Sequence, residues 1–181
     1  MNQRKVLATQ MSQQNLRGIL RWLCELLSCE TGKEVSPDSL VSCKLLGLYF
    51  SASWCPPCQH FVPILAKGYQ QIREQYGAQS FEVVLVPLDS EEANWNTFIS
   101  KMPWLTIPLS QREAIVRLFT HFEISEAPRL IVIDPSSAEV ISDNARGVGG
   151  FGFGCDPIAA YERLLEDLDK KRRSARTVKA A

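Results

Sequence analysis

The sequence predicts an α/β protein in which a central mixed β-sheet is flanked by helices. Short apolar runs that suit buried strands alternate with longer stretches whose apolar residues recur at helical spacing, and this alternation is typical of α/β folds. Near the end of the chain, two strand-like segments flank the turn Pro135-Ser136-Ser137. This arrangement predicts a hairpin, which adds an antiparallel pair to the sheet.

Residues 1–25 form an N-terminal extension in this interpretation, and part of it is helical. Residues 1–15 are polar and rich in Gln, whereas apolar residues at helical spacing predict a helix over residues 16–27. Arginines without acidic residues also fit a mitochondrial presequence. We favour the alternative that this helix packs on the domain through Trp22, Leu23 and Leu26.

The domain itself is expected to cover residues 26–169. A turn at residues 32–37 leads into a short strand. Apolar periodicity then predicts, in chain order, strand 45–52, helix 59–76, strand 81–88, helix 89–101, helix 110–122, strand 130–134, strand 139–142 and helix 157–170. The strand at 81–88 is apolar almost throughout, as expected for burial on both faces. Pro63 should kink its helix, because its ring removes a hydrogen bond.

Composition limits the classes of function. The 181 residues are 45% hydrophobic, enough for one domain with a sizeable core. The net charge of zero hides an acidic body with 10 basic and 20 acidic residues over 25–169, and six basic residues without an acidic one over 170–181. The acidic body gives no hint of nucleic-acid binding. The last segment is predicted to be a basic flexible tail. A basic run of this kind also fits a nuclear address, a polybasic binding patch or, most commonly, the solvated end of a helix.

Cysteine usage and hydropathy suggest a compartment. Six cysteines are too few for a disulfide scaffold in a chain of this length, and no signal peptide precedes them. A reducing compartment is therefore expected, and the cytoplasm is the predicted location. No membrane span is predicted, because no run of about 18 apolar residues is present.

The segment Ser53-Trp54-Cys55-Pro56-Pro57-Cys58 carries the clearest chemical signal. Two cysteines separated by two residues can close into a disulfide and open again. They lie between a strand-like run and a helix-like run, and the start of a helix favours thiolate over thiol. If Cys55 begins the helix, Cys58 lies one turn further on the same side. We then expect Cys55 to be exposed and Cys58 to lie behind it.

Two other interpretations of these motifs are weaker. A Cys-x-x-Cys pair can be half of a zinc site, but such sites need four ligands, and the remaining residues supply no second pair: Cys24, Cys29, Cys43, Cys155, His60 and His121. No metal site is predicted, and the other cysteines are not expected to take part in redox chemistry. Residues 147–154 are glycine-rich but lack the Lys-Ser/Thr ending of a phosphate loop, so a flexible surface loop is predicted.

These motifs resemble the thioredoxin superfamily, and more narrowly the tryparedoxins, with the nucleoredoxins as near relatives. The resemblance spans about residues 26–141 and is carried by residues 48–58, residues 81–84, residues 101–108 and the Ala127-Pro128 pair. It implies a thioredoxin-like fold, to which the N-terminal helical extension and the basic C-terminal tail of this chain are additions. It places Pro128 at the cis-proline of the family and Ala127 where the backbone binds a substrate strand. It also places Arg146 near the rim of the active site.

The resemblance and the dithiol together predict a thiol-disulfide oxidoreductase. Cys55 would attack a target disulfide and Cys58 would resolve the mixed disulfide. Trp54 would offer substrate a flat apolar platform, beside the stiff Pro56-Pro57 pair. The resemblance implies electron transfer from trypanothione to targets such as peroxiredoxins or other disulfide-containing proteins. No cofactor beyond the dithiol is expected. The protein is expected to be a monomer.

Departures from the family leave partners and proton transfer open. Tyr49 stands where thioredoxins have a buried Asp, so water or a carboxylate such as Asp89 or Glu91 would relay the proton of Cys58. Arg129 replaces the usual Thr after the proline, and Ala127 replaces a bulkier apolar residue. The rival prediction is a nucleoredoxin-like, redox-regulated binding protein with little reductase turnover.

Overall fold

The computed structural model describes residues 18–149 and 156–180. The strands are β1 (Leu26–Ser28), β2 (Glu34–Val35), β3 (Leu45–Ser51), β4 (Phe81–Pro87), β5 (Leu105–Thr106), β6 (Arg129–Asp134) and β7 (Glu139–Ser142). The α-helices are α2 (Pro56–Tyr76), α3 (Glu92–Ile99), α4 (Arg112–His121) and α5 (Pro157–Ala180). Three 3₁₀ segments are η1 (Gly18–Trp22), η2 (Pro37–Ser42) and η3 (Arg146–Gly149).

The strands form one seven-stranded mixed sheet in the order β2-β1-β5-β4-β3-β6-β7. At its centre β3 and β4 run parallel, while β6 pairs antiparallel with β3 and β7 closes the predicted hairpin. The predicted α/β class with a central mixed sheet flanked by helices is confirmed. All seven residues of β3 are buried. Both of its faces are covered, which explains why this run is apolar almost throughout.

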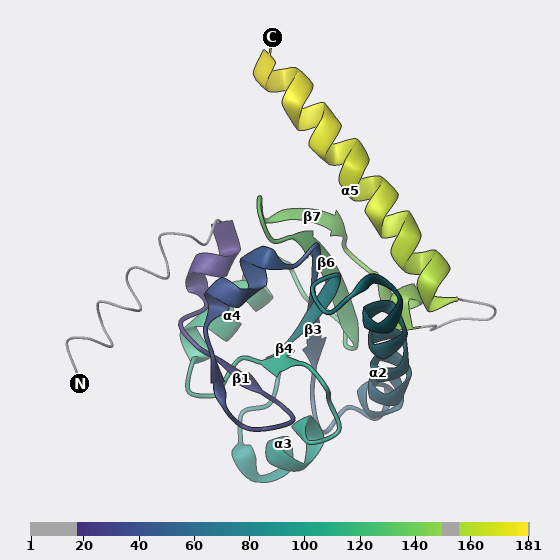
Figure 1. Ribbon diagram of the computed structural model, residues 1–181. Helices are drawn as coiled ribbons and strands as arrows, with labels where there is room; N and C mark the ends of the chain where they lie inside the picture. Colours follow the sequence, from purple (N-terminus) through teal and green to yellow (C-terminus); the bar gives the residue numbers. More distant parts are fainter. Residues whose placement is uncertain (1–17, 150–155, 181) are drawn as a thin grey trace.

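Helical segments cover both faces of the sheet (Figure 1), and an apolar layer lies on each face. One lies between the sheet and α2, α3 and α5, and it contains Tyr49 and the two cysteines of the Cys-x-x-Cys pair. The other lies under η1, η2 and α4, and it receives Leu48 and Phe50. Alternate residues of β3 thus enter opposite layers, as the strand period requires. No helix among residues 18–149 and 156–180 is both long and apolar enough to span a membrane.

The prediction of a helix over residues 16–27 is wrong for residues 18–27, the part that the structure describes. Residues 18–22 form a single 3₁₀ segment, and the chain then extends into β1, which pairs with β5. Leu20, Leu23 and Leu26 are nevertheless fully buried under the sheet. The N-terminal segment therefore packs on the domain as predicted, but as an extended chain whose strand partner is distant in sequence. Residues 1–17, and with them the presequence alternative, lie outside the described residues.

The C-terminal segment also differs from the prediction. Helix α5 continues to Ala180, so the described residues from 170 onward are not a flexible tail but the end of a helix, which was the alternative interpretation. Lys171 donates to the carbonyl oxygen of Val140 at 2.6 Å, and Arg172 pairs with Asp134. These contacts fasten the helix to the β6–β7 hairpin. Basic residues also suit the C-terminal end of a helix dipole. Figure 1 shows the last turns of α5 extending beyond the sheet.

The glycine-rich segment begins inside the core. Val148 and Gly149 are buried, and η3 packs against α2. A Cβ on Gly68 of α2 would overlap the carbonyl oxygen of Val148, and a Cβ on Gly149 would lie 2.9 Å from the ring of Phe61. The close approach of the two segments thus requires glycine on both sides. The predicted surface loop is wrong for residues 147–149, while residues 150–154 lie outside the described part of the chain.

Smaller corrections concern the remaining elements. Helices α3 and α4 are shorter than predicted, and α3 begins at Glu92 instead of residue 89. The short strand expected after the turn at 32–37 lies within that segment, as β2. Pro63 does lie inside α2. The two-residue strand β5 was not predicted, because only its pairing with β1 and β4 defines it.

Candidate active site

Cys55 lies where β3 passes into α2, at the N-cap of the helix. Its Sγ accepts a hydrogen bond from the backbone N–H of Cys58 at 3.3 Å. Helix α2 begins at Pro56, three residues earlier than predicted. Pro56 and Pro57 occupy the first helical positions, where the missing N–H removes no helical hydrogen bond. The position of Cys55 at the start of the helix is therefore as the sequence predicts.

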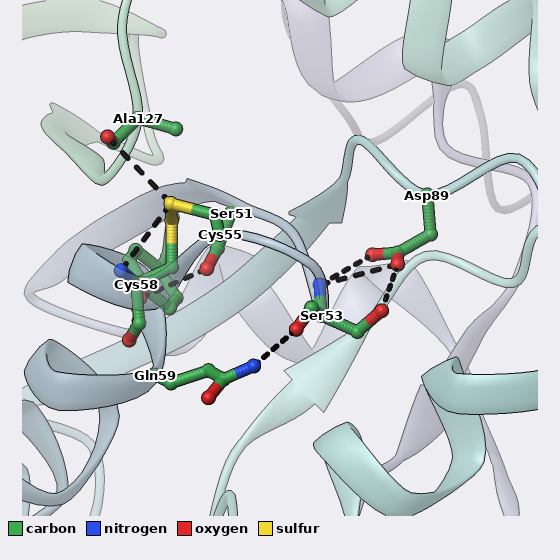
Figure 2. Close-up of a disulfide and its surroundings, with 8 residues drawn as sticks. Ser51, Ser53, Cys55, Cys58, Gln59, Asp89 and Ala127 are labelled. Atoms are coloured by element: carbon green, nitrogen blue, oxygen red, sulfur yellow. Dashed lines mark hydrogen bonds between the residues drawn. A yellow bond between two sulfur atoms is a disulfide. The ribbon is translucent and has the colours of Figure 1, made fainter.

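A disulfide joins Cys55 to Cys58, with their Cα atoms 5.2 Å apart. Cys58 is completely buried and Cys55 is 7% exposed, so the prediction of an exposed Cys55 is wrong in degree. Its Sγ lies 3.8 Å from the carbonyl oxygen of Ala127, which partly covers it (Figure 2). In the reduced protein, a Cys55 thiol at this place could donate to that oxygen. Little of Cys55 is therefore open to solvent.

The loop over Cys55 contains the predicted cis peptide bond, between Ala127 and Pro128. On the open side, Trp54 is 68% exposed, and Pro56 and Pro57 are exposed as well. An exposed tryptophan beside a reactive sulfur offers apolar area to a partner. The substrate-binding roles of these residues, and of Ala127 and Pro128, remain predictions that their positions permit.

Tyr49 lies beneath the disulfide and is fully buried. Its hydroxyl donates to the carbonyl oxygen of Cys58 at 3.4 Å and accepts from Ser51 Oγ at 3.0 Å. Burial raises the pKa of the Tyr49 hydroxyl, although the bond from Ser51 opposes the shift. Tyr49 therefore stays protonated at neutral pH and supports the first turn of α2.

The two arginines suggested by the sequence contact nearby loops. Arg129 donates from Nε to the carbonyl oxygen of Asp143 at 2.7 Å and pairs through Nη1 with Glu126 at 3.0 Å. Arg146 donates from Nε to Asn144 Oδ1 at 2.9 Å and begins η3. These contacts give Arg129 a structural role in the loop that leads to Pro128. A place for Arg146 at the rim of the active site stays a prediction.

Comparison with known proteins identifies the family. The model of the thioredoxin-like family matches residues 43–140, more than half of the chain. The chain belongs to this family.

Tryparedoxins and nucleoredoxins are among the similar proteins of this family. The tryparedoxin of Trypanosoma brucei brucei is 42% identical over 113 residues, which cover 62% of this chain and 76% of the relative. Probable nucleoredoxin 1 of Arabidopsis thaliana is 35% identical over 145 residues, which cover 78% of this chain but only 24% of that relative. The structure of native tryparedoxin I from Crithidia fasciculata superposes with a TM-score of 0.62 at 38% identity, over 72% of this chain and 90% of that one. The chain is a thioredoxin-family thiol-disulfide oxidoreductase with the Cys55–Cys58 pair.

The other cysteines differ from the redox pair of this thioredoxin-like domain. Burial, helped by the charge of Glu82, raises the pKa of Cys29 to about 12 and that of Cys43 to about 11. Cys24 is exposed, and Cys155 lies outside the described residues. Across the described part of the chain, no group of three or more His, Cys, Asp or Glu side chains could hold a metal ion.

Sequence reasoning missed the contacts of Ser53. Asp89 is one of the two carboxylates suggested as a proton relay for Cys58, and its carboxylate accepts from the N–H and the hydroxyl of Ser53. Gln59 and Arg112 complete this network. The partners lie up to 36 residues apart along the chain. The parallel β3–β4 register, which brings the ends of these strands together, is the only signal that could have paired them.

Proposed function

We propose that the protein is a tryparedoxin-like reductase that passes electrons from trypanothione to protein disulfides such as those of peroxiredoxins. The main support for this proposal is the position of Cys55 at the N-cap of α2, between the exposed Trp54 and the Ala127-Pro128 loop. Likeness to tryparedoxins over most of their length supports this donor. A related structure, tryparedoxin II complexed with glutathionylspermidine, is 32% identical with a TM-score of 0.61.

In the proposed cycle, a trypanothione thiolate attacks Cys55 and forms a mixed disulfide, while the Cys58 thiolate leaves and takes a proton from solvent. The second trypanothione thiol then displaces Cys55, and trypanothione departs as its internal disulfide. The Cys55 thiolate next attacks a disulfide in the target protein, and the leaving sulfur of the target takes a proton. Cys58 finally attacks Cys55, which releases the reduced target and restores the Cys55–Cys58 disulfide. Two electrons pass in each cycle.

The small residual exposure of Cys55, against none for Cys58, supports Cys55 as the attacking sulfur. The N–H of Cys58 and the positive end of the α2 dipole both stabilise negative charge on it. The buried Cys58 suits the resolving step, because only an intramolecular partner can reach it. The dithiol would need no further cofactor, and a monomer in the cytoplasm is part of the proposal.

A comparison of electron donors tests the proposal. The oxidised protein would be mixed with trypanothione, with glutathione, or with thioredoxin and its reductase, and reduction would be followed through a peroxiredoxin coupled to peroxide. We expect trypanothione to support the fastest turnover. Equal rates with glutathione at matched thiol concentration would exclude trypanothione as the preferred donor.

The second candidate function is a redox-regulated binding protein of the nucleoredoxin type, which the 35% identity to a nucleoredoxin favours. Reduction of insulin disulfides separates the two candidates. Turnover that continues over many equivalents of insulin supports the reductase. A single stoichiometric exchange followed by a stable complex supports the binding protein.

A further inference from the structure

Ser53, two residues before the nucleophile, is held by side chains on both sides. Its N–H lies 3.1 Å from each oxygen of the Asp89 carboxylate, and its hydroxyl also donates to Asp89. On the other side, Gln59 Nε2 donates to the carbonyl oxygen of Ser53 at 2.5 Å. Figure 2 shows Ser53 between these two side chains, with the disulfide nearby. Every polar group of Ser53 is thus engaged by Asp89 or Gln59.

The position of Asp89 follows from the centre of the sheet. Strands β3 and β4 are parallel and in register from Leu45 opposite Phe81 to Ser51 opposite Pro87. Their C-terminal ends therefore lie side by side, at the same end of the strands. The N–H of Leu88 then donates to the carbonyl oxygen of Ser51 at 2.9 Å, which extends this pairing by one step. Asp89 is the next residue, and it faces the turn that follows β3.

Asp89 is itself firmly held. It is only 3% exposed, and Arg112 of α4 donates to its backbone oxygen at 2.6 Å. A buried carboxylate is costly unless its oxygens accept hydrogen bonds, and Ser53 supplies the donors. The bonds between Asp89 and Ser53 therefore join the β4–α3 loop to the turn before α2. Through Arg112 and Gln59, they also connect α4 to α2.

The turn at residues 52–55 needs such support. It lies between the last ladder position of β3 and the first helical residue of α2, and one backbone hydrogen bond, from Cys55 N–H to the Ala52 oxygen at 3.3 Å, closes it. Thiol–disulfide exchange needs the attacking sulfur aligned with both sulfurs of the target disulfide, so its rate depends on where this turn places Cys55. Exposed Trp54 is placed by the same turn.

We propose that Asp89 is a positioning residue of the oxidoreductase. Acting through Ser53, it holds the Trp54–Cys55 turn in the orientation that exchange with a protein disulfide requires. It touches neither sulfur of the redox pair nor, by this mechanism, the substrate. The proposal concerns the exchange step itself and holds whichever reductant the protein uses.

Asp89→Asn tests the proposal in the full chain. Asparagine keeps the size of the side chain but replaces one acceptor oxygen by an NH₂ group, which conflicts with the donors of Ser53. We expect the second-order rate constant for reduction of insulin disulfides by the reduced protein to fall about tenfold, a modest loss for a misplaced reacting atom. Measurements are made where circular dichroism shows the variants folded. Glu113→Gln, an exposed site on α4, is the matched control and should keep the wild-type rate.

A second readout separates positioning from other effects. Iodoacetamide alkylation of reduced Cys55, located by mass spectrometry across a pH series, needs no alignment with a partner disulfide. We expect the midpoint of its pH profile to stay unchanged in Asp89→Asn. A shifted midpoint that accounts for the slower exchange would overturn the proposal, because Asp89 would then act through its charge on thiolate formation. An unchanged exchange rate would overturn it as well.

Ser53→Ala provides a milder variant, since it removes only the hydroxyl. We expect a several-fold loss of the exchange rate, and the double variant Ser53→Ala/Asp89→Asn should be no slower than the slower single variant, because the two side chains act through one contact. Multiplying losses in the double variant would contradict the mechanism. If the loss of exchange rate merely followed the unfolded fraction of each variant, Asp89 would contribute only to the stability of the fold.

Discussion

Arg172 of α5 binds Asp134 at the end of β6 through two hydrogen bonds, from Nε at 2.9 Å and from Nη2 at 3.0 Å. Asp134 is almost fully buried, and it also accepts from the N–H and hydroxyl of Ser136. The pair anchors the C-terminal helix, which carries the basic residues, to the sheet.

The first prediction concerns the pH dependence of this anchor. Burial alone would raise the pKa of Asp134, but the hydrogen bonds from Arg172 and Ser136 outweigh it, and the net pKa is lowered. A lowered pKa in the folded state means that the stabilisation is present above the unfolded pKa, about 3.9, and is lost as the pH falls through the folded value. Arg172→Ala should therefore lower the free energy of unfolding at pH 7, by about 1 kcal/mol, since Arg172 is partly exposed and screened by solvent.

Urea unfolding at pH 7 and at pH 3 measures this difference. It should be present at pH 7 and smaller at pH 3, because pH 3 lies below the unfolded pKa of about 3.9 and the unfolded state there already binds the proton. Arg176→Ala, on the exposed part of the same helix, is the control and should unfold like the wild type at both pH values. A constant difference between the two pH values would show that Arg172 stabilises the fold by packing and not through the carboxylate.

The second prediction assigns the roles of the two redox cysteines. Because Cys55 keeps a small exposure at the start of α2 and Cys58 has none, Cys58→Ser should still attack target disulfides but cannot release them. Mixed disulfides should accumulate and survive non-reducing electrophoresis. Cys55→Ser should abolish both turnover and trapping. Equal trapping by the two variants would show that Cys58 can also attack substrates.

The third prediction concerns the other cysteines. Burial raises the pKa of Cys29 to about 12 and that of Cys43 to about 11, so at pH 8 both stay almost entirely as thiols. Thiolate is the form that reacts with alkylating reagents. In the oxidised protein, iodoacetamide should therefore modify the exposed Cys24 well before Cys29 or Cys43. Peptide mass spectrometry after a short exposure checks the order, and rapid modification of Cys29 would show that the β1 edge opens in solution.

The redox chemistry could be predicted from the sequence because the residues of the dithiol motif are consecutive in the chain. Cys55, Pro56, Pro57 and Cys58 follow one another in the chain, and the strand-to-helix change around them is visible in the hydropathy pattern. The cis bond before Pro128 came from the family resemblance, because residue patterns alone favour trans. From residue 45 onward, each helix and strand predicted from its periodicity has the predicted type.

The failures have a common physical cause, which is pairing between distant segments. Strand β1 is set by pairing with β5, which lies about 80 residues further on, so its leucines resemble a helix in isolation. The last turns of α5 were predicted to be a charged tail, because the sequence pattern does not reveal that Asp134, 38 residues earlier, binds Arg172. The Ser53–Asp89 contact is invisible for the same reason, since neither residue carries a signal for the other.

The last prediction tests Arg146 as a recognition residue for the small dithiol. Arg146 lies at the start of η3, which packs on α2, the helix that carries the redox pair. Trypanothione carries glutathionyl carboxylates, and a partly exposed arginine that pairs with one should contribute about 1 kcal/mol or less. Arg146→Ala should therefore weaken reduction by trypanothione several-fold. Reduction by dithiothreitol should not change, because that reagent has no charge to recognise.

Stopped-flow tryptophan fluorescence of the oxidised protein, mixed with each reductant, measures both rates. Arg163→Ala, on the exposed face of α5, is the control and should leave both unchanged. Higher ionic strength should narrow the gap between the wild type and Arg146→Ala for trypanothione, since salt screens an exposed ion pair. If Arg146→Ala slowed both reductants equally, the defect would lie in the dithiol or in the packing of η3. Arg146 would then have no part in recognising the reductant.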